Sequence, residues 1–356
     1  MTPSQTSAAD PDATGPRAAA AARTALVVLN AASGDQTDRA AIAERVERTL
    51  IEHSWRVEIE AVPPEQLTDA IARACLRAKE TPGAIVVVGG GDGTIRSAAA
   101  LALKHGVPLG LLPMGTMNLL PKDLEMPLDI SAAAKAIATG IERRVDAGLV
   151  NGRVFLHSSV LGVVPLVGRE REKFRKSRTW GERLLALWRA ARHATGSPRF
   201  TMRVEHDGRL QRVRTYALAV ANNPLSDRPG EAFLRESVDG GRLAVYVSKH
   251  RGRAGLFALL FTMGTGRWAL DRQIEQAETT RVRISAFRRK LRVSNDGEVE
   301  LIRTPLDYTM QRKALRVIVP REAGGGDAQA GAEAGKPTGA ASGAEDERRE
   351  GEGSGA

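Results

Sequence analysis

Residues 85–94 read IVVVGGGDGT, and this stretch decides how the rest of the chain is interpreted. Its first half is an apolar, β-branched run that suits a buried strand. Its second half places glycines around Asp92 where that strand ends, and closes on Thr94. Glycine has no Cβ, so the backbone can turn sharply and approach a ligand closely. A helix that begins at Thr94 would offer free N–H groups to an anion, so the stretch predicts a phosphate-binding turn.

The turn differs from two well-known phosphate loops. The chain contains no G-x-x-x-x-G-K-[ST], which excludes a Walker loop, and no G-x-G-x-x-G can be read here. The question is which phosphate chemistry needs an aspartate inside such a turn.

The neighbouring sequence predicts a parallel sheet covered on both faces. Apolar runs typical of strands alternate with apolar residues at helical spacing, and this alternation favours an α/β domain. The expected strands are 25–29, 55–62, 85–88 and 108–112, and the expected helices are 40–53, 63–79 and 94–104.

Three polar, glycine-bearing turns follow strands of this sheet. Ligands of parallel sheets bind at the carboxyl ends of the strands, so the three turns should meet at one edge. Backbone amides and small polar side chains there suit phosphate oxygens. The candidate nucleotide-binding residues are Asn30, Ser33, Gly34, Gly89, Gly90, Gly91, Asp92, Gly93, Thr94, Gly115, Thr116 and Asn118.

From about residue 144 the pattern changes to short strands and turns, which predicts an antiparallel β-sandwich. The expected strands are 145–150, 154–160, 200–205, 212–221, 242–247, 281–286, 290–293 and 315–319, with helical insertions near 166–193 and 253–268. The predicted organisation is a disordered tail at 1–22, a nucleotide-binding domain at 23–143, a sandwich domain at 144–314 and a disordered tail at 321–356. The strand near 315–319 is expected to return to the first domain.

Charge and composition limit the classes of molecule that the protein can be expected to bind. The formal net charge is +10, and the acidic C-terminal tail leaves about +14 on the middle of the chain, which favours an anionic partner. Aromatic residues make up 4%, and no stacking platform or recognition helix can be read, which argues against nucleic acid. Cys75 is the single cysteine, so an internal disulfide is excluded, and no run approaches the length of a spanning helix. We expect a cytoplasmic protein that touches membranes at most from the periphery.

Assembled, these motifs resemble the diacylglycerol kinase catalytic-domain superfamily, especially its bacterial soluble lipid kinases and the related sphingosine kinases. The resemblance rests on GGGDGT at residues 89–94, P-x-G-T-x-N at residues 113–118 and the late D-G-E at residues 296–298, in that order. It implies a phosphofructokinase- and NAD-kinase-like N-terminal domain, a C-terminal β-sandwich and an active site between them. It also implies transfer of the ATP γ-phosphoryl group to a lipid hydroxyl, with magnesium.

The resemblance assigns roles to particular residues. Asp296 is our first choice for the general base and Glu298 our second. Asp92 is the candidate for holding the catalytic Mg²⁺. A family D-G-x-L segment that helps a structural magnesium site aligns with residues 239–243 in such a way that Gly240 replaces the family's aspartate, which leaves Asp239 as the candidate ligand. Ala31 and Leu119 also depart from the family pattern.

Residues 169–192 carry nine Lys/Arg against three Glu, with Trp180 and Trp188 on one helical face. One interpretation is a helix whose apolar side packs on the sandwich. The other is a helix that lies on an anionic membrane and brings the protein to its lipid.

The sequence therefore predicts an ATP-dependent lipid kinase, with diacylglycerol as the first acceptor. A sphingoid base, another acceptor such as NAD, and a non-catalytic lipid- or nucleotide-binding regulator of the same fold are the alternatives. The expected partners are a lipid and an anionic membrane, and a homodimer is left open.

Overall fold

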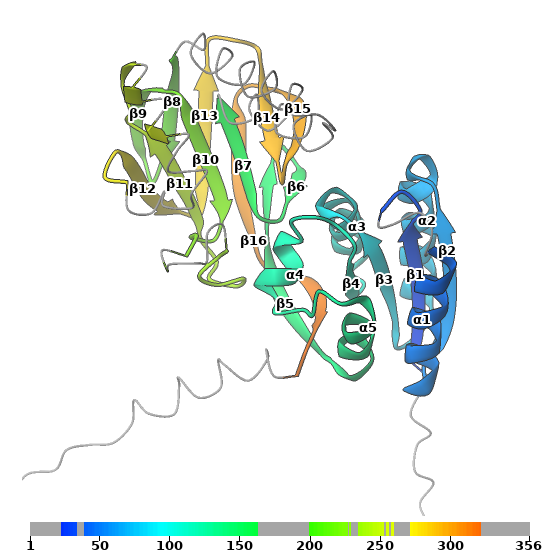
Figure 1. The fold of residues 1–356 in the computed structure, drawn as a ribbon. Helices are drawn as coiled ribbons and strands as arrows, with labels where there is room; N and C mark the ends of the chain where they lie inside the picture. The colour runs from blue at the N-terminus through cyan, green and yellow to red at the C-terminus, as the bar shows by residue number, and fades with distance from the viewer. Residues whose placement is uncertain are drawn as a thin grey trace, which may run out of the picture.

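The computed structural model of the protein describes residues 23–33, 39–162, 199–226, 228, 234–252, 254, 255, 258, 259 and 271–321. Strands and helices alternate in the first half, and strands dominate the second (Figure 1). The elements are β1 (Thr24–Asn30), α1 (Arg39–Glu52), β2 (Arg56–Val62), α2 (Pro64–Glu80), β3 (Ala84–Gly90), α3 (Asp92–His105), β4 (Leu109–Pro113), α4 (Leu119–Asp123), α5 (Ile130–Thr139), β5 (Ile141–Val150), β6 (Arg153–Phe155), β7 (Ser158–Gly162), β8 (Phe200–His206), β9 (Arg209–Thr215), β10 (Ala217–Asn222), β11 (Leu243–Ser248), β12 (Ile274–Thr279), β13 (Arg281–Ala286), β14 (Lys290–Asn295), β15 (Glu298–Arg303) and β16 (Leu306–Val319).

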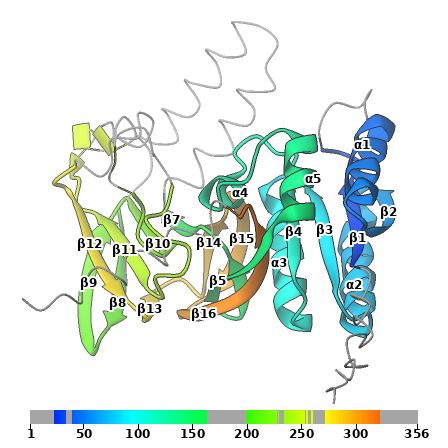
Figure 2. The ribbon, with the colours of Figure 1, turned by 90° about the horizontal axis from the view of Figure 1, so that it is seen from below.

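The first four strands form the parallel sheet that the sequence predicts, in the order β2-β1-β3-β4. Helices α1 and α5 cover one face of this sheet, and α2 and α3 cover the other (Figure 2). The indole N–H of Trp55 donates to the Ala138 carbonyl at 3.1 Å and so joins the start of β2 to α5. The α/β class of this domain is confirmed.

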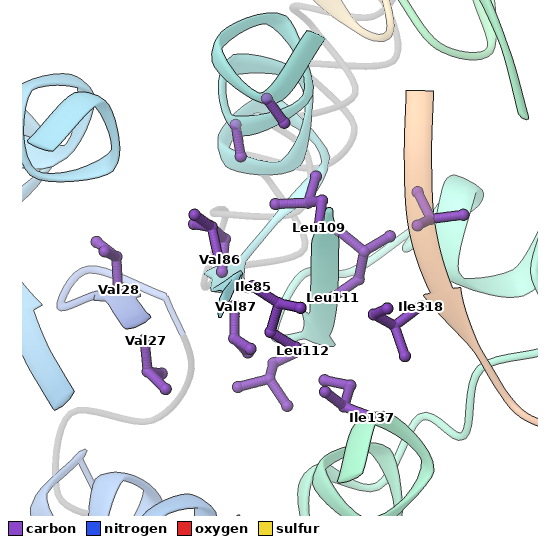
Figure 3. Packing of buried hydrophobic residues seen from close by; sticks show 14 of the residues in the cluster. Val27, Val28, Ile85, Val86, Val87, Leu109, Leu111, Leu112, Ile137 and Ile318 are labelled. Atoms are coloured by element: carbon purple, nitrogen blue, oxygen red, sulfur yellow. The ribbon is translucent and has the colours of Figure 1, made fainter. Parts of the chain in front are cut away.

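Burial on both faces explains why these strands are apolar throughout. Val86, Val87 and Val88 of β3 are fully buried, and Leu111 and Leu112 of β4 are as well. Side chains of both strands pack between the helix layers (Figure 3). Strands of a covered parallel sheet lack an alternating polar face for this reason.

Strand β16 carries the same sheet into the second half of the molecule. It pairs in parallel with β4 at Val317↔Leu109, and antiparallel with β5 and β13. The large sheet therefore runs β2-β1-β3-β4-β16-β13-β8-β9. One long strand is thus shared by the parallel and antiparallel parts.

A second, six-stranded antiparallel sheet, β12-β11-β10-β7-β14-β15, faces the antiparallel part of the first. Apolar side chains from both sheets form one core between them. Within that core Phe155 and Tyr308 meet edge to face, with ring centroids 6.0 Å apart. The predicted C-terminal β-sandwich is confirmed.

Two predicted strands are wrong in one respect. Residues 154–160 and 212–221 each looked like one strand, but each is broken where the chain crosses from one sheet to the other. The crossings lie at residues 156–157 and at Tyr216. Thr215 marks the second crossing, since its hydroxyl donates to the Ser248 carbonyl of the opposite sheet at 2.6 Å. Apolar residues stand on both sides of each break, since both sheets contribute side chains to the same core.

Several predicted elements lie outside the described residues. These are the terminal tails up to residue 22 and from residue 322, the insertion at 166–193 with its candidate membrane helix, most of the insertion at 253–268, and Gly34.

Candidate active site

The three polar turns meet at the carboxyl edge of the parallel sheet. The Asn30 side-chain amide after β1 donates to the Thr94 hydroxyl at 3.0 Å. The Met114 N–H after β4 donates to the Gly90 carbonyl at 3.1 Å. Ser33, whose N–H bonds to the Asn30 carbonyl, ends the described part of the first turn. The structure thus brings the predicted turns together, and Thr116 lies exposed on the third of them.

Close backbone approach explains the glycines. A Cβ on Gly90 would lie 2.5 Å from side-chain atoms of Thr94, and a Cβ on Gly115 would lie 2.6 Å from the Gly91 Cα. Helix α3 begins at Asp92, two residues earlier than the sequence predicts, so Gly93 and Thr94 lie in its first turn. The free N–H groups of that turn point to where an anion would bind.

Asp92 joins two of the turns. Its carboxylate accepts the N–H of Leu119 at 2.7 Å and the N–H of Asn118 at 3.1 Å. Asn118 has φ 49° and is 6% exposed, and its side chain makes two hydrogen bonds with the Gly115 backbone, each of 2.9 Å. Asp92 and Asn118 therefore hold the predicted phosphate-binding turns in place through hydrogen bonds made within the protein.

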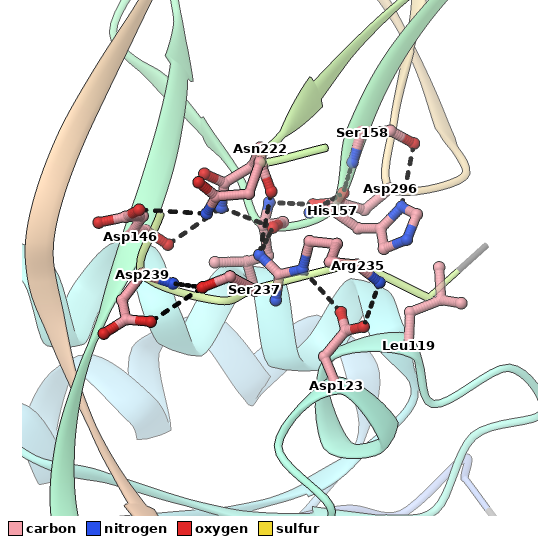
Figure 4. A network of polar contacts seen from close by, with 12 residues as sticks. Leu119, Asp123, Asp146, His157, Ser158, Asn222, Arg235, Ser237, Asp239 and Asp296 are labelled. Atoms are coloured by element: carbon pink, nitrogen blue, oxygen red, sulfur yellow. Dashed lines mark hydrogen bonds and ion pairs between the residues drawn. The ribbon is translucent and has the colours of Figure 1, made fainter. Parts of the chain in front are cut away.

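Asp296 has a comparable bracing position in the sandwich. Its carboxylate accepts three backbone N–H groups, from Leu156 at 2.7 Å, His157 at 2.8 Å and Ser158 at 3.0 Å. These residues span the crossing between the two sheets (Figure 4). Three hydrogen bonds leave a carboxylate roughly one acceptor position.

Glu298 is placed differently. Its side chain is 51% exposed and lies against the first turn of α3, where a Cβ on Gly93 would come within 2.0 Å of Glu298 Oε1. A carboxylate from the sandwich therefore meets the predicted phosphate-binding turn of the α/β domain. Glu298 is the member of the D-G-E motif that reaches across the junction.

Arg96 of α3 holds Glu298 in that position. Its guanidinium donates to Glu298 and, at 2.6 Å, to Glu300, which also accepts from Arg153. Burial alone would lower the pKa of Arg96, but the hydrogen bond to Glu300 and both carboxylate charges outweigh it and raise that pKa. Burial would raise the pKa of Glu300, but the bonds and charges of the two arginines hold it below its usual value.

A second ion pair between the domains is completely buried. Arg235 donates to Asp123 of α4 through Nε at 2.8 Å, and their side chains are 0% and 1% exposed. The same guanidinium donates to the Leu156 carbonyl at 2.9 Å, and its Nη2 has no hydrogen-bond partner among the residues that the structure describes. Arg235 thus ties α4 to the strand crossing that Asp296 also braces (Figure 4).

Asp146 organises the loop that contains the predicted structural-metal segment. It is 1% exposed and accepts N–H groups from Gly241 at 2.6 Å and Lys313 at 2.7 Å, and the side-chain amide of Asn223 at 3.1 Å. These three partners of the Asp146 carboxylate are hydrogen-bond donors of the protein.

The surroundings of Asp239 do not fit a structural metal. Burial would raise its pKa, but the Ser237 hydroxyl and the charges of Arg143 and Lys313 keep that pKa below its usual value. Arg143 lies 3.3 Å and Lys313 3.5 Å from its oxygens. Within the described ranges no three His, Cys, Asp or Glu side chains are grouped to hold a metal ion.

The surroundings of Asp92 fit a catalytic Mg²⁺ that arrives bound to the phosphates of the nucleotide better than those of Asp239 fit a structural metal. Asp92 uses each oxygen once, so a second lone pair on each remains for a water or a metal. Mg²⁺ commonly binds through one or two carboxylates together with substrate phosphates. Asp92 supplies the carboxylate of such a donor set, and its role as a ligand stays a prediction.

Sequence reasoning missed Arg96, Glu300, Asp123, Asp146 and Arg235 as site residues. Arg96 lies four residues after Asp92 in a helix that starts at the turn, which is a usable signal. Arg235 has no such signal, because its partner lies 112 residues earlier in the chain.

Comparison with known proteins supports this architecture. Residues 24–150 match the family model of the diacylglycerol kinase catalytic domain, and residues 175–319 match that of the YegS C-terminal NAD kinase beta sandwich-like domain. A diacylglycerol kinase of Staphylococcus saprophyticus is 35% identical over 115 residues, which is 32% of this chain and 37% of that protein. A probable lipid kinase, YegS-like, of Pseudomonas aeruginosa is 36% identical over 140 residues, which is 38% of this chain and 43% of that protein. The matches therefore span about two fifths of these relatives.

Solved structures show the same fold. A crystal structure of a diacylglycerol kinase from Bacillus anthracis aligns with 85% of this chain and 98% of its own, at a TM-score of 0.61 and 17% identity. The α/β domain and the sandwich together define a two-domain architecture that combines a diacylglycerol kinase catalytic domain with a YegS C-terminal domain. The chain belongs to the diacylglycerol kinase catalytic-domain superfamily. Among the described residues, no helix is long and apolar enough to cross a membrane.

Proposed function

We propose that this chain is an ATP-dependent lipid kinase that transfers the γ-phosphoryl group to the hydroxyl of diacylglycerol. The observation that carries the proposal is the contact between Glu298 and the first turn of α3. A base from one domain there faces the phosphate-binding turn of the other. Phosphoryl transfer requires this meeting of an aligned hydroxyl, a base and a held triphosphate.

The α/β domain would hold the nucleotide. Free N–H groups in the first turn of α3 and around Gly115 bind phosphate oxygens, and the Asn30–Thr94 bond fixes the distance between two of the turns. Asp92 and Asn118 keep these turns in place, since their own hydrogen bonds are made within the protein. Bound Mg²⁺ would neutralise part of the phosphate charge.

Glu298 is the better-placed base of the two carboxylates. The lipid hydroxyl oxygen attacks the γ-phosphorus, the bond from that phosphorus to the bridging oxygen breaks, and ADP leaves. The hydroxyl proton passes to the Glu298 carboxylate. Asp296 is occupied by three backbone N–H groups, so we assign it the task of holding the turn that presents Glu298.

Labelled ATP and magnesium, offered with diacylglycerol, sphingosine, ceramide, phosphatidylglycerol and NAD in separate reactions, test the proposal. We expect label in phosphatidic acid. Label on sphingosine or NAD instead would show that this molecule, and not diacylglycerol, is the acceptor. Nucleotide binding without transfer to any acceptor would favour a non-catalytic regulator of the same fold.

We also propose where the protein acts. An enzyme of this kind works in the cytoplasm, where ATP is present, and meets its acceptor at the surface of an anionic membrane. The net charge of +10 supports such a surface as the partner.

A further inference from the structure

One turn of the sandwich combines an exposed aromatic ring with basic residues. Phe287, Arg288 and Arg289 connect β13 to β14, which begins at Lys290, and all four side chains are exposed. Phe287 is 104% exposed, so its ring has no packing partner within the described part of the chain. The combination of Lys/Arg with an exposed Phe is one that segments lying in the membrane interface use.

A basic groove of about 570 Å³ lies between β9 and the end of β11. Five cationic side chains line it, against the single carboxylate of Glu275, and that carboxylate pairs with Lys249 at 2.9 Å. The cationic lining residues are Arg199, Arg212, Arg214, Lys249 and Arg251. Across the residues that the structure describes, Arg212, Arg214 and Arg251 have no ion-pair partner.

The turn and the groove lie at the same end of the sandwich. Ala286, next to the turn, pairs with Met202 of β8, and Phe200 of β8 pairs with Thr215 of β9. Thr215 in turn bonds to Ser248, beside Lys249. Figure 1 shows the β13–β14 connection at the upper end of the sandwich, whereas α4 lies at the lower end.

A like-charge contact adds to the argument. Arg203 of β8 and Arg212 of β9 lie directly opposite each other in the antiparallel ladder, and both are exposed. Like charges at such positions destabilise a sheet. An anionic partner that binds there removes the repulsion.

We propose that this end of the sandwich docks on an anionic lipid bilayer, with the arginines on the head-group phosphates and Phe287 in the interface. Arginine suits phosphate because its planar group donates two parallel hydrogen bonds. The choice of lipid as the partner rests on the proposed function. Single-stranded nucleic acid fits the groove less well, because the nearby Tyr216 ring is already covered by Arg199 at 6.0 Å.

The docking end is separate from the phosphate turns. Strand β14 begins at Lys290 and ends beside Asp296, and its six residues span roughly 20 Å. Loss of the docking end should therefore leave the catalytic end intact.

Sedimentation with phosphatidylcholine vesicles, with and without phosphatidylglycerol, tests the proposal on the full chain. We expect binding to the mixed vesicles alone. The triple variant R288Q/R289Q/K290Q should lower the partition coefficient roughly 100-fold, because each basic residue near an anionic surface contributes severalfold. F287S should weaken binding at constant charge.

The matched control is R73Q/R77Q/K79Q on α2, which removes the same charge at a distance from this end. Arg73 and Arg77 form exposed pairs with Glu60 and Glu58, so this variant should fold and bind within about threefold of the wild type. An equal loss in the control, or binding that ignores phosphatidylglycerol, overturns the proposal. So does preference for a single-stranded oligonucleotide over vesicles.

Transfer to a short-chain, water-soluble diacylglycerol separates this inference from the proposed function. We expect R288Q/R289Q/K290Q to keep wild-type transfer there and to lose it on vesicles. A wild type that binds anionic vesicles but transfers no phosphate refutes the kinase alone. If the wild type transfers phosphate but the triple variant binds vesicles as tightly as the wild type, the docking surface alone is refuted.

Discussion

Asp296 and Glu298 are two residues apart in one motif, yet they have different surroundings. The first carboxylate is used by the backbone around it, and the second projects into the junction between the domains. Sequence alone ranked them by resemblance, which favoured Asp296. The contacts now favour Glu298 as the base, and substitutions can separate the two roles.

Glu298→Gln keeps the size of the side chain and removes its basicity. We expect kcat to fall roughly 100-fold or more, because general bases contribute at least that much, while the melting temperature changes little. Transfer of label from ATP and thermal unfolding are the two measurements. Asp296→Asn should reduce stability as well as rate, since an amide cannot accept all three backbone N–H groups. Unimpaired transfer in E298Q would return the role of base to Asp296.

Gly115→Ala tests the close approach of the phosphate turns. The new Cβ would lie 2.6 Å from the Gly91 Cα, and backbone cannot move away as a side-chain end can. We expect ATP binding to weaken by about tenfold or more, with a smaller effect on folding. Gly106→Ala is unsuitable as a control because the φ of Gly106 is +70°. Ala132→Gly, at an exposed position of α5, does not touch the turns and serves as the control. Normal ATP affinity in G115A would show that the turns can move apart without loss of ATP binding.

At the scale of elements, the domain junction depends on ion pairs that differ in exposure. The Asp123–Arg235 pair is buried, whereas the network of Arg96, Glu298, Glu300 and Arg153 is partly open to water. Buried pairs are costly to break, and exposed pairs contribute little.

Asp123→Asn should therefore lower the free energy of unfolding by about 3–5 kcal/mol, because the Arg235 charge stays buried without its counterion. Replacing both residues by apolar ones of similar volume, D123L with R235M, should recover much of that loss. Denaturant titration measures both. An unchanged unfolding midpoint in D123N would mean that water reaches Arg235.

The Glu300 contacts should depend on pH. The pKa of Glu300 in the folded state lies below its ordinary value of 4.5, so its stabilising contribution is complete above that value. The contribution disappears as the pH falls through the lowered pKa. The difference in unfolding free energy between wild type and E300Q should stay constant near neutrality and shrink below about pH 4.5. If the difference persists in strong acid, the stabilisation comes from packing of the Glu300 side chain and not from its charge.

Local sequence patterns predicted the strands and helices. They did not predict the contacts between segments that are distant in the chain. The buried strand before Gly89 and the three turns follow from apolar runs and glycines, which act over a few residues. The sheet crossings at Tyr216 and residues 156–157 do not, because inward-facing residues look alike in either sheet. Arg235 was missed because any of many carboxylates could have been its partner.

At the scale of the whole molecule, β16 makes the two domains one mechanical unit. Its first half pairs with β13 and its second half with β4, and β5 follows it along both halves. We expect a single unfolding transition. ATP, which would bind to the α/β domain, should raise the unfolding midpoint reported by probes in the sandwich as well. Calorimetry with hydrogen exchange would test this, and two separate transitions would contradict it.

The position of β16 late in the chain also affects how the protein is made. Until residues 306–319 have left the ribosome, β4 and β13 have open edges where the central strand belongs. Open edges of apolar strands invite pairing with other chains. The parallel half can therefore begin to form during synthesis, but its sheet closes only after residues 306–319 have emerged. Nascent chains that stall before residue 306 should be the species that chaperones bind and that aggregates contain.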